Sequence, residues 1–184
     1  MQPCPKSGIL KQEKITSDFL FQFSQIAIPY DRVDEEYIIK PRKWNTKNLG
    51  RFMVVMGMTS SVIDVMAFAI FWFVLGYNSV EMESYFQTAW FIECLISQTL
   101  IIHFIRTEKI PFIQSRASKP LSIMSLVTVV GTIIVPIALH GIQEFNFVIL
   151  PIQFYIVVLL LNICYTVLAQ IVKRAYIKKY HEWL

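Results

Sequence analysis

Four long apolar runs, separated by short polar loops, constrain this chain more than any other feature. They comprise residues 52–76, 85–105, 121–139 and 147–172. At about 1.5 Å per residue, each run forms a helix long enough to cross a hydrocarbon core about 30 Å thick. Only a helix satisfies every backbone amide within such a run. The sequence therefore predicts an all-α integral membrane protein, a bundle of four full transmembrane helices.

The composition supports a membrane protein over a soluble one. The chain has 55% hydrophobic and 16% charged residues, whereas soluble domains are about 45–50% apolar and about 25% charged. The net charge of +4 comes from basic residues in short loops between the runs, where they anchor helices at the membrane surface. We therefore expect the lipid bilayer, and no nucleic acid, as a partner.

The basic residues also predict the orientation of the helices. Lys and Arg are frequent before the first run, in the loop 106–119 and after residue 172, whereas the loops 77–84 and 140–146 contain none. Basic loops stay on the cytoplasmic side of a membrane. The pattern predicts a multi-pass protein whose C-terminus is cytoplasmic.

A shorter apolar stretch precedes the four runs and ends in SQIAIPYDRVDEE, residues 24–36. Only about a dozen apolar residues lie before Pro29, and a span needs about 20. The upstream sequence KSGILKQEKITS is polar. We expect a truncated half-helix that lies at the cytoplasmic interface or packs partway into the bundle, with the N-terminus on the cytoplasmic side.

From Ser24 onward, the sequence resembles a known family in several long stretches. These are SQIAIPYDRVDEEYIIKPRKW, NLGRFMVVMG, SSVIDVMAFAIFWFVL and QTAWFIECLISQTLIIHFIRTEKIPFIQSRASKPL. They are similar to the C-terminal membrane domain of bacterial magnesium-transporting P-type ATPases. The likeness is dense to about Leu121, and beyond it only the topology and the basic tail correspond.

The resemblance implies a domain organisation, a location and partners. Residues 18–184 would supply the end of the family's helix six and helices seven to ten, and residues 1–17 would be an unrelated polar segment. The location would be the bacterial inner membrane. The transported ion would be Mg²⁺, and the partners would be the remaining pump helices or an intact pump. The parent family uses Mg²⁺ and ATP, and we expect no cofactor in this chain.

The chain also departs from the family. It contains no DKTGT phosphorylation motif, and no loop is long enough to form a nucleotide-binding head. We therefore expect a truncated or remnant pump without enzymatic activity of its own and without catalytic residues. Two alternatives remain open: a small membrane protein that regulates an intact pump, and a passive cation channel or carrier formed by an oligomer.

Four residues are candidate cation contacts. Glu93 and Asp64 lie near the centres of their runs, where a carboxylate costs at least about 2.5 kcal/mol unless it faces protein or water. Nearby serines could add oxygen ligands for Mg²⁺, although both acids could instead be protonated or bonded to neighbouring helices. The resemblance favours Glu93, because P-type pumps use helix eight for transport. It also places Gln22 at the family's coordinating carboxylate in N-L-x-x-D, and Asp18 at its asparagine.

Three other expectations concern structural residues. His103 is expected at the cytoplasmic interface of its helix rather than at a metal. Asn162 is expected to form a hydrogen bond between helices. Pro151 is expected to bend the fourth helix.

Overall fold

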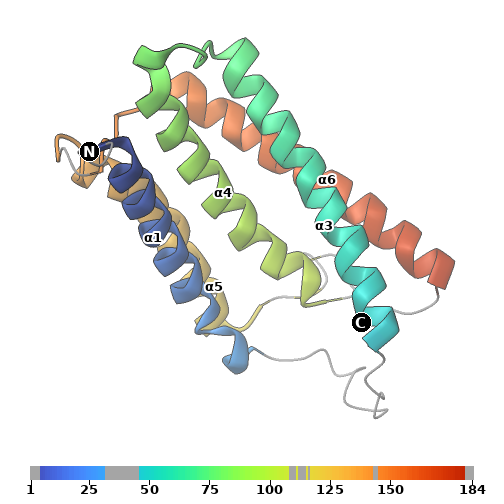
Figure 1. The fold of residues 1–184 in the computed structure, drawn as a ribbon. Coiled ribbons are helices and arrows are strands. Elements are labelled where there is room, and N and C mark those ends of the chain that lie inside the picture. The colour runs from blue at the N-terminus through green and yellow to red at the C-terminus, as the bar shows by residue number, and fades with distance from the viewer. Residues whose placement is uncertain are drawn as a thin grey trace.

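The computed structural model describes residues 5–31, 46–107, 111, 115, 117–142 and 145–180. Five long helices form an elongated bundle (Figure 1). They are α1 (Pro5–Gln25), α3 (Thr46–Ala69), α4 (Glu83–Ile105), α5 (Lys119–Ala138) and α6 (Ile152–Tyr180). Three single turns accompany them, namely η1 (Ile28–Tyr30), η2 (Ile70–Val74) and η3 (Val80–Met82). Four of the helical segments are long and apolar enough to span a membrane, which confirms the predicted fold class.

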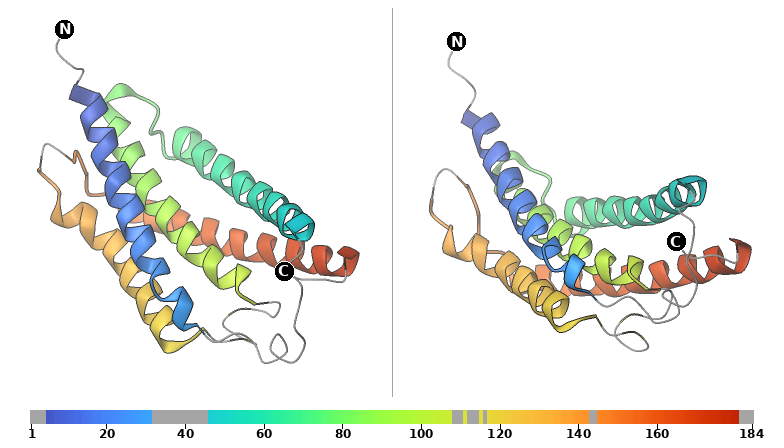
Figure 2. Two further views of the ribbon diagram at one scale, coloured as in Figure 1. Left: turned by 60° about the horizontal axis from the view of Figure 1, so that its bottom comes forward. Right: turned by 90° about the horizontal axis from the view of Figure 1, so that it is seen from below.

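α4 is the central helix of the bundle. It packs against α1 and α5 on one side and against α3 and α6 on the other, as Figure 2 shows in two further views. Of its most apolar window, 56% is buried inside the protein, compared with 28% for each of the other three spans. Side chains on α4 are therefore the best shielded from lipid, including the candidate contact Glu93.

The core between the helices is rich in aromatic rings. The ring centroids of Phe71 in η2 and Phe154 in α6 are 5.6 Å apart. Those of Phe91 in α4 and Phe147 are 5.0 Å apart. All four side chains are buried. Close ring pairs of this kind add to the energy of apolar burial. They fix α3, α4 and α6 together at the end of the bundle where α4 begins.

The first span ends in a π-helical turn. Residues Ile70–Val74 form this turn, and the amide of Leu75 bonds to the carbonyl oxygen of Ile70 at 3.0 Å. Gly76 follows with a φ of +72°. A residue with a Cβ rarely adopts that angle, so glycine lets the chain turn sharply into the next loop.

The fourth span differs from its predicted limits at both ends. Residues 147–151 are not helical, and α6 continues through the basic tail to Tyr180. Pro151 does not bend this helix, because it lies immediately before the first helical residue, Ile152. Proline is tolerated at the start of a helix because no intrahelical partner awaits its missing N–H there.

α1 packs lengthwise into the bundle instead of lying across its end. Leu20 and Ser24 share one face of α1, and Ala27 lies just beyond its last residue. Ser24 and Ala27 are buried, and Leu20 lies over Gly131 of α5. α1 begins at Pro5, near the end of the bundle where α4 also begins (Figure 1). Of the two predicted poses, packing into the bundle is therefore observed. The sequence, however, predicted that the N-terminus lies on the side of the basic loops, which is the end where α4 ends. That residues 1–17 are unrelated sequence stays a prediction.

Candidate cation site

Glu93 is fully buried at the centre of the bundle. Its side chain is 0% exposed, and within the described part of the chain neither carboxylate oxygen has a hydrogen-bond partner. Buried polar groups are almost always bonded, so an unbonded pair of oxygens calls for an explanation such as a proton or an ion. The sequence placed Glu93 in mid-span, and the structure adds that it faces protein.

Asp64 of α3 lies close enough to Glu93 for the two carboxylates to interact electrostatically. Its side chain is half-buried. Ser60 lies one turn before Asp64, within hydrogen-bonding reach of the Tyr165 hydroxyl on α6. The structure therefore brings polar groups from three helices together inside the membrane-spanning part of the bundle. Two neighbouring carboxylates repel each other unless a proton or a cation lies near them.

The serines that the sequence associated with these acids bond first to their own helices. Ser97 Oγ donates to the carbonyl oxygen of Cys94 at 3.1 Å, and Ser61 Oγ donates to that of Gly57 at 3.0 Å. A hydroxyl that donates in this way still has lone pairs to accept with. Ser97 is buried, whereas Ser61 is exposed, which makes Ser97 the better placed of the two to add an oxygen near Glu93.

Asp18 and Gln22 lie apart from this group. Both are exposed on α1, one helical turn from each other and on the same face as Ile15 and Phe19, which are exposed as well. The sequence-predicted contacts therefore form two sets: Glu93 with Asp64 inside the bundle, and Asp18 with Gln22 on an outer face.

Neither set is a complete metal site. Among the described residues, no group of three or more His, Cys, Asp or Glu side chains could hold a metal ion. Mg²⁺ requires six oxygen ligands and usually retains several water molecules, with one or two carboxylates from the protein. The Glu93–Asp64 pair can supply these one or two carboxylate ligands.

Three buried polar groups have partners that sequence reasoning did not identify. His103 lies in the last turn of α4, where it is buried, and its Nε2 is 2.9 Å from Ser125 Oγ on α5. Asn162 donates from Nδ2 to Val158 O within its own helix, at 2.9 Å, instead of between helices. Tyr165 was missed, although a tyrosine within an apolar run is a signal that its hydroxyl has a polar neighbour.

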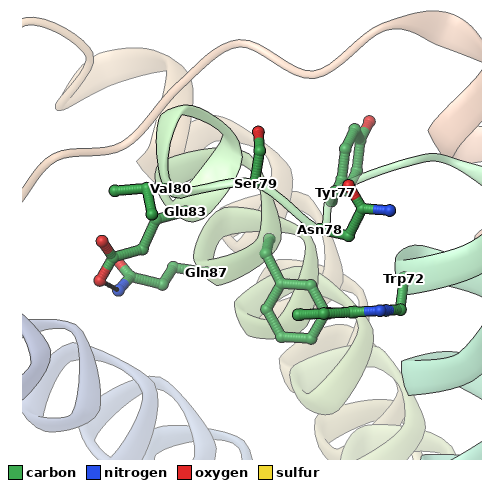
Figure 3. A pocket seen from close by; sticks show the side chains of 8 residues that line it. Trp72, Tyr77, Asn78, Ser79, Val80, Glu83 and Gln87 are labelled. Atoms are coloured by element: carbon green, nitrogen blue, oxygen red, sulfur yellow. Dashed lines mark hydrogen bonds between the residues drawn. The ribbon is translucent and has the colours of Figure 1, made fainter.

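A pocket of about 310 Å³ lies at the α3–α4 loop (Figure 3). Trp72, Phe86 and Glu83 contribute to its lining. The Glu83 carboxylate accepts from Gln87 Nε2 at 3.3 Å. Tyr77 also lines the pocket, and burial, together with the nearby Tyr85, raises the pKa of its hydroxyl. The phenol therefore stays neutral near pH 7.

Comparison with known proteins gives a consistent result. Residues 19–175 match the family described as "Cation transporting ATPase, C-terminus". The chain is 41% identical over 174 residues to "Magnesium-transporting ATPase, P-type 1" of Salmonella typhimurium LT2, covering 92% of this chain and 18% of that protein. It is 39% identical over 176 residues to the protein of the same name in Escherichia coli K12, covering 96% and 20%. The chain spans about a fifth of the length of these relatives.

Proposed function

The chain belongs to the family of cation transporting ATPase C-termini, and from that membership we propose that it works as the C-terminal membrane region of a magnesium-transporting P-type ATPase. Its relatives in two bacteria carry the name of such a pump. In this proposal the pump uses ATP, moves Mg²⁺, and lies in the bacterial inner membrane with its C-terminus in the cytoplasm.

One observation carries the ion-handling part of the proposal: the buried Glu93 carboxylate, which lacks a bonded partner within the described residues. A charged carboxylate in that position is energetically unfavourable unless a proton or a cation neutralises it. With Asp64 nearby on α3, a hydrated Mg²⁺ would find two negative groups facing the protein interior. Glu93 is the contact that we expect to matter most, and Asp64 the second.

The exposed face of α1 supports the presence of further pump helices. Asp18 and Gln22 are exposed there among apolar side chains. Polar groups that face lipid are costly, and transmembrane helices usually turn them toward other helices. The remaining membrane helices of the pump would cover this face, so that Asp18 and Gln22 would also lie inside protein.

The 184 residues contain no DKTGT motif, so in this proposal ATP-driven transport requires the other parts of the pump. The regulator and the passive channel gain no support from a specific observation.

The test is Glu93→Gln in an intact pump that carries this chain. Gln preserves the shape of the side chain but removes the charge that attracts Mg²⁺. We expect the apparent affinity for Mg²⁺ in the ATPase assay to fall about tenfold, equivalent to about 1.4 kcal/mol. Glu81→Gln is the matched control, since Glu81 is exposed in η3. An unchanged Mg²⁺ dependence in the Glu93→Gln pump would show that Glu93 only packs.

A further inference from the structure

One carboxylate, Asp31, joins three helix ends. It lies directly after η1, at the end of the α1 segment. Its Oδ2 accepts from Arg106 Nε at 2.6 Å, and its Oδ1 accepts from the backbone amide of Ser118 at 2.8 Å. Arg106 is the C-cap residue of α4, and Ser118 is the N-cap residue of α5. The α1 segment is therefore tied to α4 and α5 at the same point.

The ion pair within this junction is well shielded. The side chains of Asp31 and Arg106 are only 13% and 9% exposed. Arg106 Nη2 also donates to Ser115 Oγ at 3.3 Å, so the guanidinium is held by more than one acceptor. Charge-assisted bonds in a fixed geometry are stronger and more directional than those of an exposed pair. Arg106 also places a positive charge at the negative end of the α4 dipole.

The position of this pair along the helices has a geometric consequence. α1 and α4 are packed together and run in the same direction (Figure 1). Asp18 lies 13 residues before Asp31, and Glu93 lies 13 residues before Arg106. At about 1.5 Å per helical residue, Glu93 lies about 20 Å from the ion pair along α4. On the other side of the junction, α1 ends at Gln25, and a turn and η1 lie between that end and Asp31. The junction therefore ties the end of the α1 segment to the end of α4, the helix along which α1 packs.

We infer that Arg106 is a positioning residue of the pump, which fixes the axial register of α1 against α4 through its ion pair with Asp31. This inference rests on the proposed function, because the groups that it aligns are the candidate cation contacts: Asp18 and Gln22 on α1, and Glu93 on α4. A slip of α1 along α4 would shift Asp18 and Gln22 relative to Glu93.

The first test uses Asp31→Asn and Arg106→Gln, singly and together, in an intact pump. In Asp31→Asn, Oδ1 can still accept from Ser118, but an NH₂ group replaces the oxygen that faces Arg106 Nε. We expect each single variant to weaken the apparent Mg²⁺ affinity about three- to tenfold while turnover at saturating Mg²⁺ is retained. The double variant should be no worse than the worse single variant, since both remove one interaction.

Two further variants frame this result. Arg106→Lys keeps the charge but loses the planar fork, so its affinity should fall between those of the wild type and Arg106→Gln. Arg174→Gln removes an exposed charge from α6 and should shift the affinity less than twofold. Unchanged affinity in both single variants, or losses that multiply in the double variant, would overturn the inference.

A second measurement separates this inference from the proposed function. The same double-mutant cycle, measured as thermal unfolding of the purified 184-residue chain in lipid nanodiscs, requires no transport. The stability losses of the Asp31 and Arg106 variants should not add there either. Additive losses would refute the positioning role of Arg106. One outcome is that Glu93→Gln leaves the Mg²⁺ affinity unchanged while the Asp31 and Arg106 variants lower it together. That outcome would refute the Glu93 contact and support the positioning role of Arg106. If Glu93→Gln lowers the affinity and the Asp31 and Arg106 variants do not, only the positioning role of Arg106 is refuted.

Discussion

Lys173 of α6 is fully buried and donates from Nζ to the carbonyl oxygen of Phe104, in the last turn of α4, at 3.2 Å. It also bonds to the carbonyl oxygen of Thr107, and its side chain is 1% exposed. The last carbonyls of a helix have no partner within the helix, and a cation there interacts favourably with the helix dipole. A residue that the sequence presents as part of a basic tail is in fact the cap of the central helix.

This relationship predicts the effect of removing the ammonium group. Lys173→Met keeps the length of the side chain but leaves two buried carbonyl groups without their donor. An unsatisfied buried group costs about 1–3 kcal/mol, so the purified chain should unfold at a distinctly lower temperature in detergent. Lys178→Met, at an exposed position of the same helix, is the control. Equal stability of the two variants would contradict the capping role of Lys173.

The turn after the π-helix predicts a contrast between two glycines. Gly76 has a φ of +72°, and no atom lies within 4 Å of the position that a Cβ would occupy. Gly76→Ala should therefore be destabilising through backbone strain alone, by about 1–2 kcal/mol. Gly57 lies within α3 with the same free space and no positive φ. Gly57→Ala should be neutral or stabilising by about 0.5–1 kcal/mol. Unfolding of the two variants, measured side by side, checks this, and equal losses would argue against strain at Gly76.

The distribution of basic residues predicts the orientation in the membrane. Reporter fusions after Tyr77 and after His140 should give a periplasmic signal, because their loops contain no Lys or Arg. Fusions after Lys109 and at Leu184 should give a cytoplasmic signal. A cytoplasmic signal from the Tyr77 fusion would reverse the whole topology.

The missing phosphorylation motif predicts a negative result with ATP. The purified 184-residue chain, incubated with labelled ATP and Mg²⁺, should form no acid-stable phosphoenzyme, because it contains no DKTGT aspartate. An intact relative that carries the motif serves as the positive control. Any acyl-phosphate trapped on this chain would refute the assignment.

The candidate site could be predicted in part. Glu93 and Asp64 stand out because a carboxylate inside an apolar run costs free energy unless it faces protein or water, and the structure places the two within range of electrostatic interaction. The proximity of Tyr165 and Ser60 could not be predicted, because it depends on how α3 and α6 are rotated about their axes. Nothing in the spacing of residues along one helix reports that rotation relative to another helix.

The sequence alone was enough to predict the four spans, since an apolar run of that length can satisfy its own backbone in a membrane only as a helix. It also determined the family, through long stretches of shared residues. The three-dimensional fold was needed to show that α4 is central, that α1 packs along it, and that Lys173 and Asp31 both bond to residues at the end of α4. These arrangements arise from contacts between residues about 70 positions apart, as in the bonds from Arg106 to Asp31 and from Lys173 to Phe104. Helix periodicity is a local property, whereas such contacts depend on how whole helices fit against one another.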